Sequence, residues 1–103
     1  MEEDFVAVGT VGDIATGEMK LVEVGGIKIS IANVDGTIHA FDDLCTHQHC
    51  SLSQGELDGI AVECPCHGSR FDVASGAVLS PPATEPVKTY PVRIDGETIT
   101  VRV

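Results

Sequence analysis

Glycine-containing turn dipeptides divide the chain into short strands, and they constrain its fold more than any other feature. Gly25-Gly26, Asp35-Gly36 and Asp95-Gly96 each stand between two runs rich in β-branched residues, and such dipeptides suit tight hairpin turns that need positive φ. From Ile27 to Ala32, isoleucine alternates with lysine, serine and alanine, which is the period of two of a half-buried strand. Three hairpins and almost no helix signal predict an antiparallel all-β fold, closed or sandwiched so that no long edge stays exposed.

The length and the charge of the chain limit its size class and its partners. A chain of 103 residues fits a single domain over 1–103, because single cores divide only beyond roughly 250 to 300 residues. Sixteen acidic and six basic residues give a formal net charge of −10. This charge argues against nucleic acid and anionic membranes, whose phosphates are bound by clustered Lys and Arg. A basic protein surface is the more natural partner.

The apolar segments of the chain are short. None reaches the roughly 18 to 20 residues that span a bilayer, and Met1-Glu2-Glu3-Asp4 places acids where a secretory signal carries bases. We therefore expect a soluble, cytoplasmic protein. In that reducing compartment, four cysteines are interpreted first as metal ligands and only second as a disulfide scaffold.

Two Cys-His loops carry the chemistry of the sequence. They are Cys45-Thr46-His47 and Cys64-Pro65-Cys66-His67, with a short strand candidate at 60–63 between them. Each loop offers one thiolate and one imidazole, which suits either a tetrahedral zinc site or a 2Fe-2S cluster with two cysteines on one iron and two histidines on the other. Residues two apart in an extended chain project from one face with Cα atoms roughly 6 to 7 Å apart. Cys45 and His47 therefore reach two irons more easily than one ion, although a bent loop would still allow zinc.

This double motif resembles the two cluster-binding loops of the Rieske iron-sulfur proteins, which are similar to Cys45-Thr46-His47 and Cys64-Pro65-Cys66-His67-Gly68-Ser69. The resemblance covers the central third of the chain. It implies a Rieske-type antiparallel sandwich or barrel, with a cluster-binding subdomain of two loops at about 43–82 and one 2Fe-2S cluster. The implied ligands are Cys45 and Cys64 on one iron and His47 and His67 on the other.

The resemblance also assigns roles to residues beside the ligands. Cys50 and Cys66 match a disulfide that joins the two loops in respiratory-complex Rieske proteins and that many dioxygenase ferredoxins lack; two free thiols are the alternative. Ser69 corresponds to a hydroxyl that donates to a cluster sulfur and raises the reduction potential, and the alternative is a serine that caps its own turn. Phe71 stands where high-potential members carry tyrosine. With the acidic composition, it predicts a potential in the lower part of the Rieske range of about −150 to +300 mV.

Other residues near the motifs have plainer interpretations. We expect His39 to be an ordinary histidine of the sheet and His49 to be an exposed neighbour of the ligands. Pro81-Pro82 fits either a loop that covers the cluster or a plain turn. The acids around the motifs indicate either a docking patch for a basic partner or a solvated face. These acids are Asp42, Asp43, Glu56, Asp58, Glu63 and Asp72.

The short chain is similar to the soluble Rieske ferredoxins of bacterial aromatic-ring-hydroxylating dioxygenases. The resemblance implies a monomeric electron carrier rather than an enzyme, which takes single electrons from a ferredoxin reductase to a terminal oxygenase in aromatic hydrocarbon catabolism. The sequence has no Gly-x-Gly-x-x-Gly loop after a strand, so electrons are expected from a separate protein. Two alternatives stay open, a small Rieske-type subunit of a nitrite reductase-like complex and a structural zinc-binding module.

Overall fold

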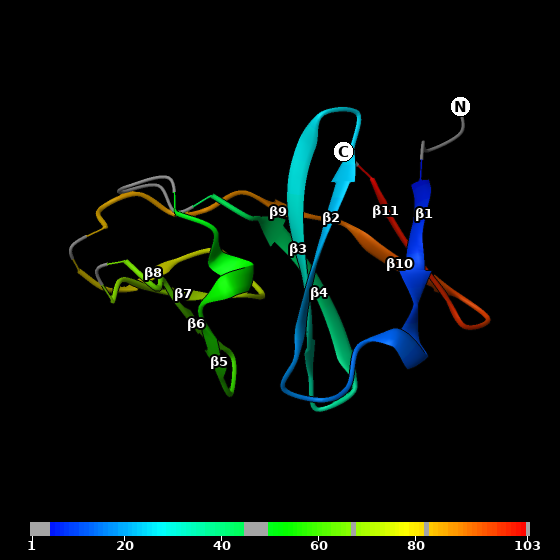
Figure 1. The fold of residues 1–103 in the computed structure, drawn as a ribbon, viewed down its shortest axis with the longest axis horizontal. Helices are drawn as coiled ribbons and strands as arrows, with labels where there is room; N and C mark the ends of the chain where they lie inside the picture. The colour runs from blue at the N-terminus through cyan, green and yellow to red at the C-terminus, as the bar shows by residue number, and fades with distance from the viewer. Residues whose placement is uncertain (1–4, 45–49, 67, 82, 103) are drawn as a thin grey trace.

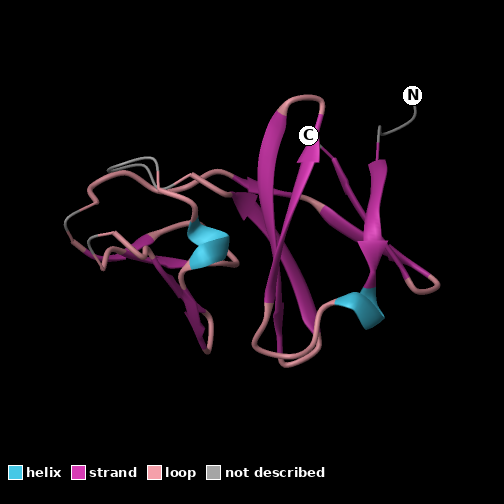
Figure 2. Ribbon diagram, in the orientation of Figure 1, coloured by secondary structure: helices cyan, strands magenta, loops and turns pink. Residues whose placement is uncertain are grey.

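The computed structural model describes residues 5–44, 50–66, 68–81 and 83–102 (Figure 1). Within these ranges the chain forms eleven β-strands and two short 3₁₀ helices (Figure 2). The strands are β1 (Phe5–Thr10), β2 (Met19–Val24), β3 (Ile27–Val34), β4 (Thr37–Asp42), β5 (Glu56–Asp58), β6 (Ala61–Glu63), β7 (Arg70–Asp72), β8 (Val78–Ser80), β9 (Thr89–Tyr90), β10 (Val92–Asp95) and β11 (Thr98–Arg102). The 3₁₀ helices are η1 (Val11–Asp13) and η2 (Leu52–Gln54). No helix among these residues is long and apolar enough to cross a membrane.

The described strands assemble into three sheets, and every pairing in them is antiparallel. Their strand orders are β1-β11-β10, β2-β3-β4-β9 and β5-β6-β7-β8. In Figure 1 the sheet of β5 to β8 lies at one end of the molecule, the sheet of β2, β3 and β4 in the middle, and β1, β10 and β11 at the other end. The all-β antiparallel prediction is confirmed, with the motif-bearing segment in a subdomain of its own.

All three predicted hairpins are present. Strands β2 and β3 meet at Gly25 and Gly26, with φ of 58° and 85°, and β3 and β4 meet at Asp35 and Gly36, with φ of 52° and 88°. The hairpin of β10 and β11 turns at Gly96. Two successive residues with positive φ match the right-handed twist of the flanking strands, which is why these dipeptides mark the turns.

Strand β3 departs from the expected half-buried pattern, because both of its faces are covered. Ile29 and Ile31 are fully buried in a core beneath the middle sheet. Ser30 and Ala32, on the opposite face, are also fully buried, and Ala32 belongs to a second core formed with the cluster-loop subdomain. The polar side of β3 therefore does not face water; it is the surface on which that subdomain packs.

Candidate metal centre

The second Cys-His loop is the turn of a hairpin. It joins β6 to β7, whose last and first residues, Glu63 and Arg70, are paired. Two backbone hydrogen bonds close the loop: the N–H of Cys64 donates to the carbonyl of Ser69 at 2.8 Å, and the N–H of Gly68 donates to the carbonyl of Cys64 at 3.1 Å. The loop ends at Ser69, because Arg70 to Asp72 form β7, in which Phe71 is fully buried.

The first Cys-His loop is closed at its base in a similar way. It follows β4, and Leu44 forms an isolated antiparallel bridge with Ser51. The N–H of Leu52 then donates to the carbonyl of Asp43 at 2.6 Å. Residues 45–49, which include Cys45, His47 and His49, lie outside the described ranges, as do His67 and Pro82.

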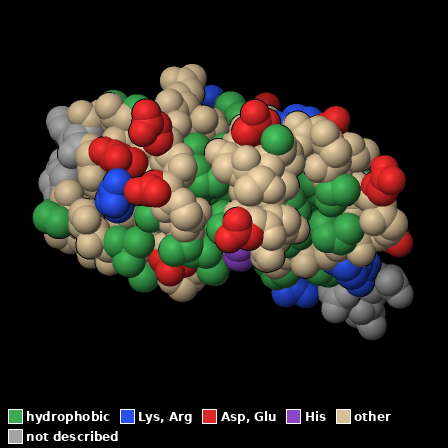
Figure 3. Space-filling model, turned by 90° about the horizontal axis from the view of Figure 1, so that it is seen from below, with side chains coloured by type: hydrophobic (Ala, Val, Ile, Leu, Met, Phe, Trp, Pro, Cys, Tyr) green, Lys and Arg blue, Asp and Glu red, His purple; other side chains and the backbone are tan. Residues whose placement is uncertain are grey.

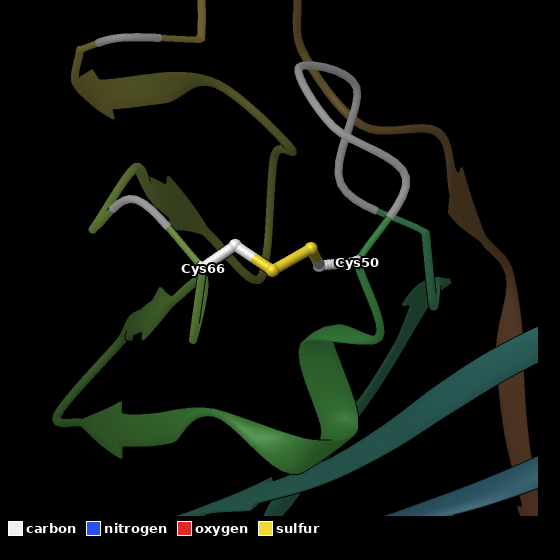
Figure 4. The surroundings of a disulfide bond; sticks show 2 residues. All are labelled: Cys50 and Cys66. Carbon is white, nitrogen blue, oxygen red and sulfur yellow. A yellow bond between two sulfur atoms is a disulfide. The ribbon is translucent and has the colours of Figure 1, made fainter.

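A disulfide joins the two loops (Figure 4). Cys50 and Cys66 are bonded, with 6.4 Å between their Cα atoms and a sequence separation of 16, so the predicted pairing is confirmed. The sulfur of Cys64 lies within 4.8 Å of both disulfide sulfurs. Because the thiols of Cys50 and Cys66 are joined in the disulfide, Cys64 is the cysteine of this group that can supply a thiolate to a metal.

Cys64 stands at the edge of an open hollow. Its side chain is 2% exposed, and the hollow beside it has a volume of about 350 Å³, with Gly55, Glu63 and Pro65 among its lining residues. Soft thiolate ligands suit iron-sulfur clusters and zinc. A buried thiol held outside the disulfide, on a loop that is bonded to the other Cys-His loop, fits the donor set of a cluster shared between the two loops.

Ser69 is fully buried directly after the second loop. Its hydroxyl oxygen accepts a hydrogen bond from the N–H of Ala83 at 3.0 Å, so this side chain reaches another segment of the chain and does not cap its own turn. None of the described residues accepts the hydroxyl proton. Ser69 thus connects Ala83 to the residues that follow the second loop, and its hydroxyl retains a proton with which to donate.

Two carboxylates at the end of β4 have partners inside the protein. Asp43 is 1% exposed. Burial alone raises the pKa of Asp43, but hydrogen bonds from Ser30, Ser51 and Ser53 outweigh it and hold the pKa below the ordinary value. Asp42 accepts a hydrogen bond from the hydroxyl of Tyr90, and burial together with this carboxylate raises the pKa of Tyr90 well above its usual value. The idea that Asp43 belongs to a surface docking patch is wrong.

The other acids of the group do lie on one outer surface, which we call the acidic face. Along β5, β6 and β7, one set of alternating residues, including Val62 and Phe71, is turned into the core. The opposite set carries Glu56, Asp58, Glu63, Arg70 and Asp72. Arg70 lies 3.5 Å from carboxylate oxygens of Asp58 and Glu63, and Figure 3 shows acidic side chains gathered around a basic one at this end of the molecule.

His39 and Pro81 lie in different surroundings. His39 lies in β4, opposite Ala32 of β3, and is partly buried, as expected for a histidine of the sheet. Pro81 is exposed, while the bond of Ala83 to Ser69 brings the same segment to the second loop. The interpretation of Pro81-Pro82 as a loop that covers the cluster stays a prediction, because Pro82 lies outside the described residues.

Comparison with known proteins decides the kind of centre these loops build. The sequence model of the Rieske [2Fe-2S] domain family matches residues 4–91 of this chain. The chain belongs to the Rieske family. Its cofactor is therefore a Rieske-type 2Fe-2S cluster, and the zinc alternative has no support from this match. The Rieske fold expected from the double motif is confirmed as well.

Similar Rieske proteins are named as ferredoxins of dioxygenase systems. The chain is 41% identical over 95 residues to the ferredoxin component of the naphthalene 1,2-dioxygenase/salicylate 5-hydroxylase systems of Ralstonia sp., which covers 92% of this chain and 91% of that protein. It is 44% identical over 98 residues to the biphenyl dioxygenase ferredoxin subunit of Pseudomonas sp. strain KKS102, covering 94% and 90%. A solved complex of reduced oxygenase and oxidized ferredoxin in carbazole 1,9a-dioxygenase contains a chain that matches with a TM-score of 0.92 and 32% identity, covering 98% and 94%.

The Ser69→Ala variant is expected to have a lower reduction potential. A hydroxyl that donates to a cluster sulfur stabilises the extra electron. A differential of about 1.4 kcal/mol, within the range for an ordinary protein hydrogen bond, corresponds to about 60 mV for a one-electron couple. A redox titration followed by the cluster absorbance measures the shift. Ser75→Ala is the control, because its hydroxyl accepts from the N–H of Ala77 on an exposed turn. Equal potentials in Ser69→Ala and the parent protein would contradict the donated hydrogen bond.

Loss of the disulfide is expected to lower stability without changing the fold. In the chain-entropy model, opening a loop of this length costs about 3 kcal/mol, so the Cys50→Ser/Cys66→Ser protein should melt roughly 12 to 24 °C lower. Thermal denaturation at matched iron content measures this difference. Treating the parent protein with a thiol reductant should reproduce it, and a reductant-insensitive melting temperature would mean that the bond contributes little.

Proposed function

We propose that this Rieske protein is the ferredoxin component of a multicomponent dioxygenase system, an electron carrier that delivers single electrons to a terminal ring-hydroxylating oxygenase. The observation that carries this proposal is the identity of 41% to 44% with ferredoxin components of dioxygenase systems over more than nine tenths of the chain. The likeness to a ferredoxin solved in complex with its oxygenase supports the same partner.

We further propose that Cys45 and Cys64 bind one iron of the cluster and that His47 and His67 bind the other. The bound cluster supplies a site that accepts and releases one electron. The chain's own part is to hold these side chains: hydrogen bonds close the bases of both loops, and the disulfide fixes one loop to the other. Fixed ligands need little rearrangement when the charge of the cluster changes, which favours rapid electron transfer.

The remaining features of the proposal concern the donor and the state of the protein. We propose a separate ferredoxin reductase as the donor, because the sequence lacks a dinucleotide-binding fingerprint. We also propose that residues 1–103 act as one domain, as a monomer in the cytoplasm; a net charge of −10 opposes self-association through like surfaces. The acidic face is available for a basic partner surface.

Two measurements test this function. Protein purified without oxygen and reduced with dithionite should give the electron paramagnetic resonance (EPR) spectrum of a 2Fe-2S cluster with mixed sulfur and nitrogen ligands, with iron and sulfide present. The reduced protein should then be reoxidised rapidly by the terminal oxygenase of a naphthalene or biphenyl dioxygenase system. An EPR-silent protein that contains zinc would overturn the cofactor assignment. An intact cluster that no such oxygenase reoxidises, but that a nitrite reductase does, would favour the alternative complex.

A further inference from the structure

Asp43 is bound through every polar group it has. Its carboxylate accepts three hydrogen bonds: from the hydroxyl of Ser30 at 2.6 Å, from the hydroxyl of Ser51 at 2.6 Å and from the N–H of Ser53 at 2.9 Å. Its backbone N–H donates to the carbonyl of Lys28 at 3.1 Å, and its carbonyl accepts from the N–H of Leu52. The residue therefore connects three segments: β3, the end of β4, and the chain that returns from the first cluster loop.

The contacts of Asp43 lie at the base of the first cluster loop, and they involve two of the few buried polar side chains. The described residues that are both polar and buried are Ser30, Asn33, Asp43 and Ser69. Ser30 and Asp43 share one hydrogen bond beneath the first loop, and Ser69 stands after the second. Burying a carboxylate is unfavourable unless donors compensate it. Asp43 also contributes to the self-repulsion of a chain whose formal net charge is −10. These two penalties direct attention to the geometry that the Asp43 carboxylate imposes on its hydrogen-bond donors.

The geometry imposed here is the base of the first cluster loop. Leu44 and Ser51 face each other at that base, and the carboxylate holds Ser51 and Ser53 on one side and Ser30 of β3 on the other. The disulfide restrains the first loop relative to the second, but it makes no connection to the middle sheet. The Asp43 contacts supply that connection, so the two restraints act on different degrees of freedom.

We propose that Asp43 is a positioning residue, which fixes the base of the first cluster loop on β3 and so sets where Cys45 and His47 lie relative to Cys64. The inference rests on the proposed function, in which those residues are cluster ligands. Groups that orient metal ligands without touching the metal commonly change metal affinity by 10- to 100-fold. Removal of the carboxylate should therefore change the electronic structure of the iron pair and the retention of iron, not only the stability of the protein.

The test compares Asp43→Asn with Asp42→Asn. Both variants remove one negative charge just before the first loop, but Asp42 binds Tyr90, away from the three serines. For Asp43→Asn we expect a shifted and broadened EPR spectrum of the reduced protein and release of iron to a chelator at least ten times faster than from the parent. For Asp42→Asn we expect the parent spectrum and release rate.

Further variants keep the test decisive if Asp43→Asn does not fold. Ser51→Ala and Ser30→Ala each keep the carboxylate and remove one donor, and both should shift the spectrum in the same direction as Asp43→Asn by a smaller amount. The inference is overturned if all of these variants retain the parent spectrum and iron release, or if Asp42→Asn changes both as much as Asp43→Asn. In the first case the contacts are merely structural, and in the second the effect is charge alone. Failure of the proposed function is distinguished separately, because the parent protein would then lack the cluster spectrum.

Discussion

Replacing Gly76 with alanine is expected to lower the free energy of unfolding by about 2 to 5 kcal/mol. Gly76 has a φ of 81°, and a Cβ added there would meet the carbonyl oxygen of Val87 at less than the 3.0 Å that real Cβ atoms keep. The N–H of Val87 also donates to the carbonyl of Gly76 at 3.0 Å. The backbone after the 81–83 segment and the turn between β7 and β8 therefore touch where a side chain would separate them.

Two other glycines separate the two causes of this loss. Gly96 has a φ of 68° with open space around its added Cβ, so Gly96→Ala carries only the conformational cost of about 1 to 2 kcal/mol. Gly55 has an ordinary φ of −86°, but an added Cβ would collide with the carbonyl oxygen of Glu63, so Gly55→Ala carries only the steric cost. Gly76→Ala should lose about as much as the other two together.

Chemical denaturation at matched cluster content measures these three free energies. Gly76 lies in the turn between β7 and β8, and Gly55 lies against Glu63 at the base of the second loop. A loss in Gly76→Ala no larger than that in Gly96→Ala would mean that the backbone at Val87 yields easily, and that the packing of this segment does not constrain the cluster loops.

Local rules explain why the hairpins could be predicted from sequence. Gly25-Gly26 and Asp35-Gly36 need positive φ at both positions, which few other dipeptides tolerate, and the alternation from Ile27 fixes which side chains share a face. The same locality explains the success with the cluster loops, since the spacing of Cys64 and His67 and the partner motif of Cys45 and His47 carry a family signature that needs no tertiary information. The ligand assignment itself stays a prediction, because Cys64 is the one proposed ligand within the described residues.

The errors come from contacts between segments far apart in sequence. Ser30 occupies a polar position of an alternating strand, where a solvent-exposed side chain is expected. It is buried because the cluster subdomain packs on its face of β3. Asp43 looks like one more acid in an acidic chain, and its burial depends on donors that include Ser30, thirteen residues earlier. The Ser51-Leu52-Ser53 sequence, with two hydroxyls directly after the first loop, was the available signal for a buried acceptor. It becomes informative only when the return of the chain to β4 is known.

The Cys64→Ser variant is expected to lose the cluster. Serine has nearly the shape of cysteine, so the buried position can be filled, but a hydroxyl does not provide the thiolate that iron-sulfur clusters require. Iron and acid-labile sulfide should fall below roughly a tenth of the parent values, since the remaining three ligands cannot compensate for the missing thiolate. The reduced protein should give no cluster EPR signal. Circular dichroism and the intact Cys50–Cys66 bond would show that the protein still folds.

The matched control is the Cys50→Ser/Cys66→Ser double variant, and a single replacement would not serve. Removing Cys66 alone would leave a Cys50 thiol whose sulfur lies within 4.8 Å of Cys64, close enough to pair with Cys64 or to replace it. With both removed, Cys64 has no neighbouring sulfur in this group, and the double variant should assemble a complete cluster when it is produced without oxygen. If the double variant lost the cluster while Cys64→Ser kept it, the ligand would have to be sought at Cys50 or Cys66. Their bond would then belong to the cluster-free protein alone.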